Sequence, residues 1–301
     1  MTRPAVRGRI FIVGVPRSGT TLVQSLLAAH SATTSFTETH FFDRHFKILP
    51  LGSRPLLTAN PVARVREFLI ENREEPGAAA RWFTEASPWS LRFPPLRLLQ
   101  TRRVARRLLL VLDELAQRRG SPYWIEKTPR HLRYLPFLAR LSDGAPEAKF
   151  VHVIRDGPDV VASLNEASRR WDHHYDVDTS IRRWNEDVAF SLSRSREPND
   201  SFIFYEELVS RPEPTLRRIL GELNLDWEPQ ILEHYGREAS ELVTAEESWK
   251  TDVARPLSRS RTSDRRLTAE QRKRVESSLR RDLYEELYAS ATRQKSTDED
   301  D

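Results

Sequence analysis

The stretch Gly14-Val-Pro-Arg-Ser-Gly-Thr-Thr21 decides the fold of this 301-residue chain. It follows a short apolar run, residues 9–14, that has the composition of a buried strand, and it leads into residues 20–29, whose apolar positions recur at helical spacing. A glycine-bounded turn between a strand and a helix directs backbone N–H groups and the positive end of the helix dipole toward an anion. The stretch therefore predicts a phosphate loop at the start of an α/β fold.

Further apolar runs alternate with helical patterns along the chain. Strands are expected at residues 9–14, 33–38, 123–126, 149–154 and 201–205. Helices are expected at residues 20–29, 132–141, 159–166, 179–195, 213–223 and 268–287. Such alternation is typical of a mostly parallel sheet flanked by helices. The sequence thus predicts a P-loop-like three-layer α/β fold.

The organisation predicted from the sequence is a single domain over residues 1–292. Residues 50–63 contain three prolines and are expected to form a loop. The helical pattern of residues 62–120 is expected to form a cap inserted over the site. Residues 293–301 are polar and end in acidic residues, which predicts a disordered tail.

Composition excludes several classes of function. The chain has no cysteine, which excludes disulfides, thiol catalysis and thiolate metal sites. Its 48 basic and 44 acidic residues give a net charge of +4, which suits an anionic ligand. The arginines are scattered and do not alternate with aromatic residues, so no nucleic-acid surface is expected. No apolar stretch approaches the roughly 18 residues of a membrane span, and no secretory segment is evident, so we expect no membrane span and a cytoplasmic protein.

The loop lacks the lysine of the Walker phosphate loop, because Thr20 stands in its position. That lysine spans the β and γ phosphates of a triphosphate next to Mg²⁺, so its absence disfavours triphosphate chemistry. A 5′-phosphosulfate needs one cation that reaches a phosphate and a sulfate, and Arg17 can supply it. Ser18, Gly19, Thr20 and Thr21 add backbone and hydroxyl donors. The alternative is a tight strand-to-helix turn with no ligand.

The stretch Val15-Pro-Arg-Ser-Gly-Thr-Thr-Leu22 resembles the 5′-phosphosulfate loop of the sulfotransferases that use 3′-phosphoadenosine 5′-phosphosulfate (PAPS). It is most similar to the branch that holds protein-tyrosine sulfotransferases and many bacterial enzymes, where arginine replaces the lysine of the cytosolic type. The resemblance implies PAPS as the co-substrate and no metal.

Two further segments resemble the same family. Phe150-Val-His-Val-Ile-Arg155 and the following residues to Ser163 are similar to its 3′-phosphate element, in which an arginine ends a strand and a serine follows eight residues later on a helix. Tyr205 lies in a weaker match, at the strand-to-helix element whose tyrosine lies near the nucleotide in the family; a half-buried core aromatic is the alternative. The resemblance covers residues 9–40, 122–165 and 200–225.

The resemblance also implies residues for the chemistry. Glu38 lies 21 residues after Arg17, the spacing of a catalytic glutamate in protein-tyrosine sulfotransferases, and is the expected base. Lys127 matches a lysine that contacts the phosphosulfate bridge, and Arg17 also counts as catalytic. The cytosolic branch has a catalytic histidine where this chain has Pro129, which leaves His131 as a reserve base. A glutamate in a polar loop is the alternative for Glu38.

Other regions are less informative. The segment 249–256 is similar to a late loop that closes over nucleotide in relatives, which makes Lys250 and Arg255 candidate ligands, or else a plain basic loop. His40 and His45 are five residues apart with no third ligand evident, so no metal site is expected. A cluster of aromatic residues could line an acceptor cleft, although core positions are favoured: Phe41, Phe42, Trp82, Phe83 and Trp89.

The function expected from the sequence is transfer of a sulfuryl group from PAPS to a hydroxyl or amine acceptor. The acceptor could be a small molecule, a carbohydrate or a peptide, and no pattern distinguishes them. Two alternatives remain: a P-loop phosphotransferase that uses ATP and Mg²⁺, and a non-catalytic nucleotide-binding module.

Overall fold

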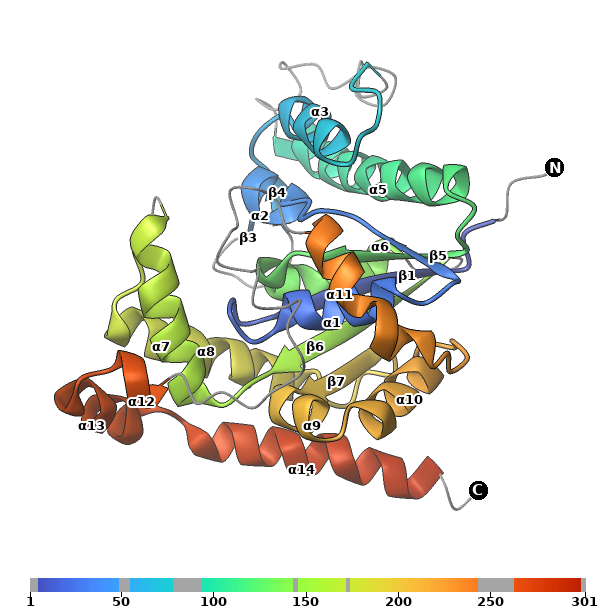
Figure 1. Cartoon of the computed structure of the whole chain (residues 1–301). Coiled ribbons are helices and arrows are strands. Elements are labelled where there is room, and N and C mark those ends of the chain that lie inside the picture. The colour runs from blue at the N-terminus through green and yellow to red at the C-terminus, as the bar shows by residue number, and fades with distance from the viewer. Residues whose placement is uncertain are drawn as a thin grey trace. The chain divides into compact units, whose positions relative to one another are not determined.

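Figure 1 shows the chain as a computed structural model, which describes residues 5–48, 55–77, 94–142, 146–171, 174–242 and 263–298. The chain divides into two compact units. Unit 1 comprises Met1–Phe11 and His30–Ala148, and unit 2 comprises Ile12–Ala29 and Lys149–Asp301. The interpretation of residues 62–120 as a cap on a single domain stays a prediction.

The five-stranded sheet has the order β2-β5-β1-β6-β7. Its strands are β1 Gly8–Gly14, β2 Thr33–Ser35, β5 Tyr123–Lys127, β6 Glu147–Ile154 and β7 Asp200–Phe204. Strands β2 and β5 pair in parallel with Thr33 opposite Tyr123, and β6 and β7 pair in parallel with Val153 opposite Ile203. Every residue of β1 is buried, as expected for a central strand of a parallel sheet. The predicted α/β class with a mostly parallel sheet flanked by helices is confirmed.

Unit 1 contains several helices, a small hairpin and a buried ion pair. Its other elements are α2 Phe41–His45, β3 Phe46–Ile48, β4 Pro55–Leu57, α3 Val62–Glu71, α5 Pro94–Arg118, the 3₁₀ helix η2 Pro129–Tyr134 and α6 Leu135–Leu141. Asp113 of α5 accepts hydrogen bonds from the Arg9 guanidinium and, at 2.8 Å, from the Trp124 indole. A strand stands at β4, where a loop was predicted, because β4 pairs with β3 and the Leu57 N–H reaches Thr101 Oγ1.

Unit 2 carries the helices that follow the phosphate loop and the last two strands. They are α1 Thr20–Ala28, α7 Gly157–Ala167, the 3₁₀ helix η3 Ser168–Arg170, α8 Val177–Ser193, α9 Tyr205–Ser210, α10 Pro212–Glu222, α11 Gln230–Leu242, α12 Ser263–Arg266, α13 Ala269–Ser278 and α14 Arg281–Asp298. A buried cluster that includes Val160, Trp184, Phe204 and Leu287 joins α7, α8, β7 and α14.

The C-terminal helix of the prediction was wrong in two respects. Two helices replace the single one expected over residues 268–287, because Leu279 is extended. The side chain of Asn185 explains the break: its amide donates to the Ser278 carbonyl and accepts the Arg280 N–H, which satisfies one group from each helix end. Helix α14 also continues through residues 293–298, which were expected to be disordered.

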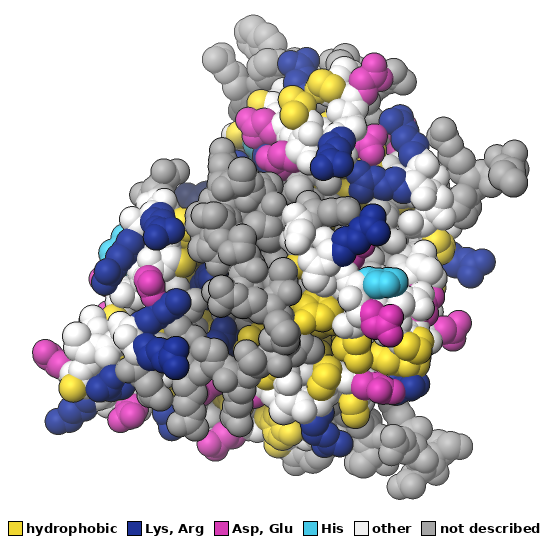
Figure 2. Space-filling model, viewed as in Figure 1, with side chains coloured by type: hydrophobic (Ala, Val, Ile, Leu, Met, Phe, Trp, Pro, Cys, Tyr) yellow, Lys and Arg dark blue, Asp and Glu magenta, His cyan; other side chains and the backbone are white. Residues whose placement is uncertain are grey.

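Figure 2 shows Lys and Arg side chains interspersed with Asp and Glu on the displayed face, as the scattered arginines of the sequence suggest. Among the described helices, none has the length and apolar composition needed to cross a bilayer.

Candidate functional site

The predicted phosphate loop leaves β1 at a position that requires glycine. Gly14 has φ +150°, and a Cβ atom there would lie 2.4 Å from the carbonyl oxygen of Val153 on β6. A backbone oxygen cannot move aside as a side chain can, so the close approach of the two strands depends on this glycine. The loop then turns tightly, with the Ser18 N–H donating to the Val15 carbonyl at 3.1 Å.

The start of α1 is arranged to receive an anion. Gly19 precedes the helix with φ +94°, and within the described residues no side chain caps α1 and no acidic residue occupies its first turn. The first N–H groups of a helix have no partner inside the helix. The Ser18 side chain is fully buried, and its Oγ has no hydrogen-bond partner among the described residues. Uncapped N–H groups beside an unpaired buried hydroxyl are a site for phosphate or sulfate oxygens.

Arg17 has φ +76°, a left-handed conformation that is uncommon for a residue with a side chain. Its Nε donates to Ser163 Oγ on α7 at 3.2 Å. Strained backbone of this kind persists where surrounding contacts hold it, and it is concentrated at functional sites. The loop cation and the predicted 3′-phosphate serine are thus in direct contact.

Arg155 follows β6 and joins the same cluster. Its Nη1 donates to the Arg17 carbonyl at 3.4 Å, and its guanidinium lies 4.4 Å from the centre of the Tyr205 ring. The carbonyl of Arg155 accepts the indole N–H of Trp184 at 3.1 Å, which fixes the backbone of the arginine. Burial raises the pKa of Tyr205, so the phenol is neutral at physiological pH, and its ring faces the Arg155 guanidinium in a cation–π contact.

Four residues predicted from separate motifs therefore meet in unit 2: Arg17, Arg155, Ser163 and Tyr205. The Tyr205 ring also covers the loop, because a Cβ atom on Gly19 would lie 2.4 Å from its Cδ2. Thr20 and Thr21 are buried in the first turn of α1. Asp159 contributes an acidic group to this cluster, because its Oδ2 lies 3.6 Å from Arg155 Nη2.

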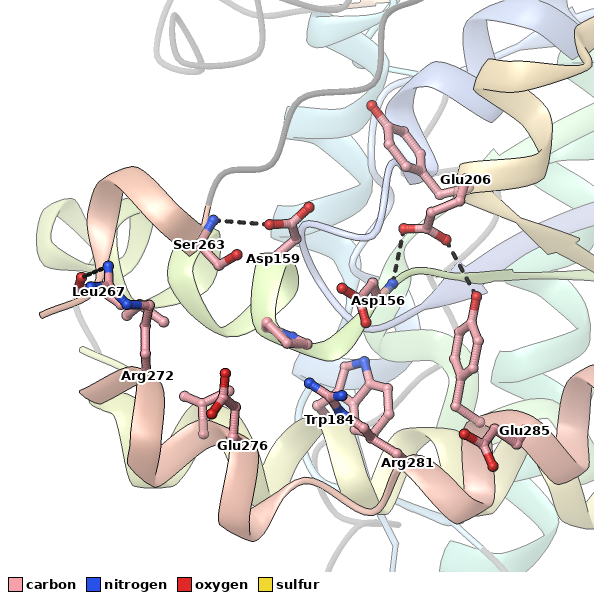
Figure 3. A pocket seen from close by; sticks show the side chains of 14 residues that line it. Asp156, Asp159, Trp184, Glu206, Ser263, Leu267, Arg272, Glu276, Arg281 and Glu285 are labelled. Carbon is pink, nitrogen blue, oxygen red and sulfur yellow. Dashed lines mark hydrogen bonds between the residues drawn. The ribbon is translucent and has the colours of Figure 1, made fainter. Parts of the chain in front are cut away.

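A pocket of about 580 Å³ adjoins this cluster, and sequence reasoning missed it. Figure 3 shows Glu206 of α9 pointing toward Asp156, and its carboxylate accepts a hydrogen bond of 3.0 Å from the Asp156 N–H. Its other oxygen accepts a hydrogen bond of 3.4 Å from the hydroxyl of Tyr284. On another wall Asp159 accepts the Ser263 N–H. Burial raises the pKa of Glu206. These bonds tie the turn after Arg155 to the C-terminal helices.

Unit 1 holds the predicted catalytic pair. Lys127 Nζ, at the end of β5, donates to Glu38 Oε1. The Lys127 side chain is 3% exposed and the Glu38 side chain is 19% exposed, so the pair is shielded while the carboxylate keeps access to solvent. Arg64 of α3 holds the backbone here, donating to the carbonyls of Glu38 at 2.6 Å and of Thr39 at 2.8 Å. Sequence reasoning named the pair but not their contact.

A buried network lies beside this pair. Glu126 accepts hydrogen bonds from the hydroxyls of Thr39 and Thr128 at one oxygen, and its other oxygen lies 3.0 Å from His131 Nδ1. His131 Nε2 lies 3.4 Å from Asp43 Oδ1 and 3.2 Å from the backbone N of Phe42. Burial alone would lower the pKa of His131, but the two carboxylates raise it to about 9. The Phe42 N–H donates to Nε2, so the ring is enclosed by a backbone donor as well as by the two carboxylates.

His131 as a reserve base stays a prediction. Its side chain has no exposed surface and lies between two buried carboxylates. The ring links η2 to α2 through Asp43. Nothing in the sequence signalled this network, because Glu126 and Thr39 are 87 residues apart.

Some of the other site residues predicted from the sequence lie in the part of the chain that the structure describes, and others do not. Phe41 and Phe42 are buried, with Phe41 packed edge-on against Phe68, so the favoured core interpretation is confirmed for these two. Lys250 and Arg255 lie outside the described residues, as do Trp82, Phe83 and Trp89. In the part of the chain that the structure describes, no group of three His, Asp or Glu side chains is arranged to hold a metal ion.

The chain is similar in sequence to known proteins. Protein-tyrosine sulfotransferase 1 of Danio rerio is 28% identical over 75% of this chain and 55% of its own length. The protein-tyrosine sulfotransferase of Drosophila melanogaster is 27% identical over 75% of this chain and 40% of its own length. The chain thus spans about half the length of the curated relatives it matches.

The fold has a solved counterpart as well. The sulfotransferase domain from the Synechococcus PCC 7002 olefin synthase aligns with a TM-score of 0.55 at 18% identity, covering 91% of this chain and 95% of that chain. The family model described as Sulfotransferase family matches residues 9–229, so the chain belongs to the sulfotransferase family.

Proposed function

We propose that the protein transfers a sulfuryl group from PAPS to a hydroxyl acceptor, with Glu38 as the base. The observation that carries the proposal is the meeting of Arg17, Arg155, Ser163 and Tyr205 around an uncapped helix start in unit 2. Two arginines there offer one cation for a 5′-phosphosulfate and another for a 3′-phosphate. A nucleoside triphosphate has no phosphate on its 3′ oxygen, so the second arginine would have no 3′-phosphate to bind.

The residues present suit PAPS in their chemistry. The buried Ser18 hydroxyl and the first N–H groups of α1 are donors for the phosphosulfate oxygens. The Tyr205 ring offers a flat apolar surface that is already stacked on Arg155. No metal is needed to neutralise the donor, because Arg17 and Arg155 supply the positive charge.

The chemistry assigned to the chain follows from these charges. Glu38 takes the proton of the acceptor hydroxyl as the oxygen bonds to sulfur and the bond between sulfur and the bridging oxygen breaks. Lys127 keeps Glu38 ionised and oriented by its hydrogen bond to Oε1. Arg17 and the α1 N–H groups stabilise the charge that develops on the departing 5′-phosphate.

A tyrosine phenol in a peptide is the first acceptor to test, because the relatives named above are protein-tyrosine sulfotransferases. The experiment uses PAPS labelled with ³⁵S and a panel of tyrosine peptides, simple phenols, glycans and hydroxylated lipids. Label transfer that needs neither ATP nor Mg²⁺ supports the proposal. Phosphate transfer from labelled ATP with Mg²⁺, and none of sulfate, would replace it with a phosphotransferase.

A further inference from the structure

His40 lies between the proposed base and a buried carboxylate. Its Nε2 is 3.3 Å from Glu38 Oε2, and its Nδ1 is 3.2 Å from Asp43 Oδ2. The other oxygen of Glu38 is taken by Lys127. A proton accepted by Glu38 therefore resides on Oε2, the oxygen that faces the imidazole.

We propose that His40 is a proton relay that returns Glu38 to its ionised form after each transfer. The inference rests on the proposed function, because it assigns Glu38 as the base. The neutral ring donates its Nδ1–H to Asp43 and presents the Nε2 lone pair to Glu38. The proton moves from Glu38 Oε2 to Nε2, and the resulting imidazolium is stabilised by the Asp43 carboxylate.

The last step delivers the proton to water. The His40 side chain is 25% exposed, whereas the Asp43 and Lys127 side chains are 7% and 3% exposed. The Glu38 side chain is 19% exposed, so His40 is the most exposed of these four side chains. Transfer of a sulfuryl group from PAPS to an alcohol releases one proton, and this route carries it from the acceptor through Glu38 and His40 to water.

His40 has an unfavourable backbone conformation that its neighbours hold in place. His40 has φ +51°, in the left-handed region, immediately before α2. Its N–H donates to Thr128 Oγ1, and Thr128 in turn donates to Glu126. The surrounding network keeps a strained residue at this position, which is the pattern expected where side-chain placement matters.

Several charged groups surround the ring. The Glu38 and Asp43 carboxylates lie next to it, and Lys127 pairs with Glu38. The elements packed here also carry Arg44 of α2, Arg64, Glu67 and Glu71 of α3, Glu126 of β5, and Arg130 and His131 of η2. Hydrogen bonds from His131 and His40 outweigh burial and hold the pKa of Asp43 well below its ordinary value, so Asp43 stays an anion throughout the cycle.

Two substitutions keep the backbone conformation and remove the relay. Glycine and asparagine both tolerate a left-handed φ, so His40→Gly and His40→Asn are not strained by the exchange itself. Asparagine retains a polar contact with the neighbouring carboxylates but does not titrate. Glycine leaves room for a free imidazole molecule. Binding of adenosine 3′,5′-bisphosphate by each variant, measured by calorimetry, shows that it is folded.

The decisive experiment is rescue by added imidazole, with the acceptor that gives the highest rate in the panel above. We expect kcat to fall about tenfold or more in both variants with the KM for PAPS unchanged. Imidazole should restore most of the lost rate to His40→Gly and none to His40→Asn. Wild-type kcat in His40→Asn, or no rescue of His40→Gly at any imidazole concentration, would overturn the relay.

A second measurement needs no acceptor and separates failure of the relay from failure of the proposed function. The ring ¹⁵N signals of the eight histidines are compared at one pH in wild type and Glu38→Gln, with His40→Asn identifying those of His40. Loss of the Glu38 carboxylate should shift the Nε2 signal of His40, because Oε2 lies 3.3 Å from Nε2. Identical His40 signals in the two proteins would show that the two groups are not coupled and would overturn the relay, whether or not the wild type transfers sulfate.

Discussion

The Nε of Arg17 donates a hydrogen bond of 3.2 Å to the Oγ of Ser163, although 146 residues separate them in sequence. Arg17 belongs to the loop after β1, and Ser163 belongs to α7, which follows β6. The bond joins the loop assigned to the 5′-phosphosulfate with the element assigned to the 3′-phosphate. Unit 2 thus presents both cationic groups as one preassembled set, which reduces the cost of ordering them on binding.

Arg155→Ala should weaken binding of adenosine 3′,5′-bisphosphate about 10- to 100-fold, because a hydrogen bond to a charged group is worth roughly 1.5–3 kcal/mol. Binding of adenosine 5′-monophosphate, which lacks the 3′-phosphate, should change little. Calorimetry with both nucleotides measures the difference.

Arg217→Ala is the matched control, because Arg217 also stacks on an aromatic ring, 4.5 Å from the centre of Trp227, but lies on the exposed face of α10. It should bind both nucleotides as the wild type does. If Arg155→Ala weakened the binding of both nucleotides equally, Arg155 could not be assigned to the 3′-phosphate.

Gly14→Ala should destabilise the fold by roughly 3 kcal/mol or more, because it adds backbone strain at φ +150° and an overlap with the Val153 carbonyl oxygen. Chemical denaturation measures the change in the free energy of unfolding. Gly221→Ala is the control: its new Cβ atom meets nothing within 4 Å and it lies in α10, so it should be neutral or stabilise by up to about 1 kcal/mol. Equal stability of the two variants would contradict the assigned role of Gly14.

Glu38→Ala should lower kcat for sulfuryl transfer by about 10²- to 10⁴-fold, the usual contribution of a general base. Nucleotide affinity should be retained, because a carboxylate does not attract the anionic groups of a nucleotide. Rates with labelled PAPS and calorimetry with adenosine 3′,5′-bisphosphate make the comparison. Glu71→Ala is the control, since it removes a nearby carboxylate that pairs with Arg64 rather than with Lys127. An unchanged kcat in Glu38→Ala would exclude it as the base.

The buried His131 predicts a pH dependence of stability. Its pKa is about 9 in the folded protein against 6.5 in the unfolded chain, so the charged ring stabilises the fold fully below pH 6.5. The free energy of unfolding should fall by roughly 3 kcal/mol as the pH rises from 6.5 through 9. Urea denaturation across this range tests it. His131→Gln should be less stable at pH 6.5 and should lack most of this decline; a wild-type stability that is constant from pH 6.5 to 9 would show that the ring is neutral.

The parts of the fold that could be predicted are the elements whose signal lies in the local sequence. The strands around Ile12, Val151 and Ile203 are apolar runs next to turn residues, and all are present as β1, β6 and β7. Helix α11 was missed although Ile231, Tyr235 and Ala239 recur four residues apart and are buried. The break between α13 and α14 could not be read locally, because it depends on Asn185, which lies 95 residues before Arg280.

The candidate site likewise combines residues that could be predicted from the sequence with contacts that could not. Arg17, Arg155, Ser163 and Tyr205 stand in recognisable motifs, and the structure brings them together. The Glu126 network and the bond from Tyr284 to Glu206 join residues from distant segments, and a buried carboxylate does not reveal its partners in a single sequence. His131 is buried between two carboxylates that only the tertiary structure brings to it.

The central claim is that unit 2 binds a nucleotide bearing both a 5′-anion and a 3′-phosphate. Calorimetric titration of the wild-type chain with adenosine 3′,5′-bisphosphate and with adenosine 5′-monophosphate, in the presence of EDTA, tests it most directly. The account predicts at least about tenfold tighter binding of the bisphosphate, as one additional charge-assisted contact provides. Equal affinity for the two nucleotides, or binding that requires Mg²⁺, would contradict it.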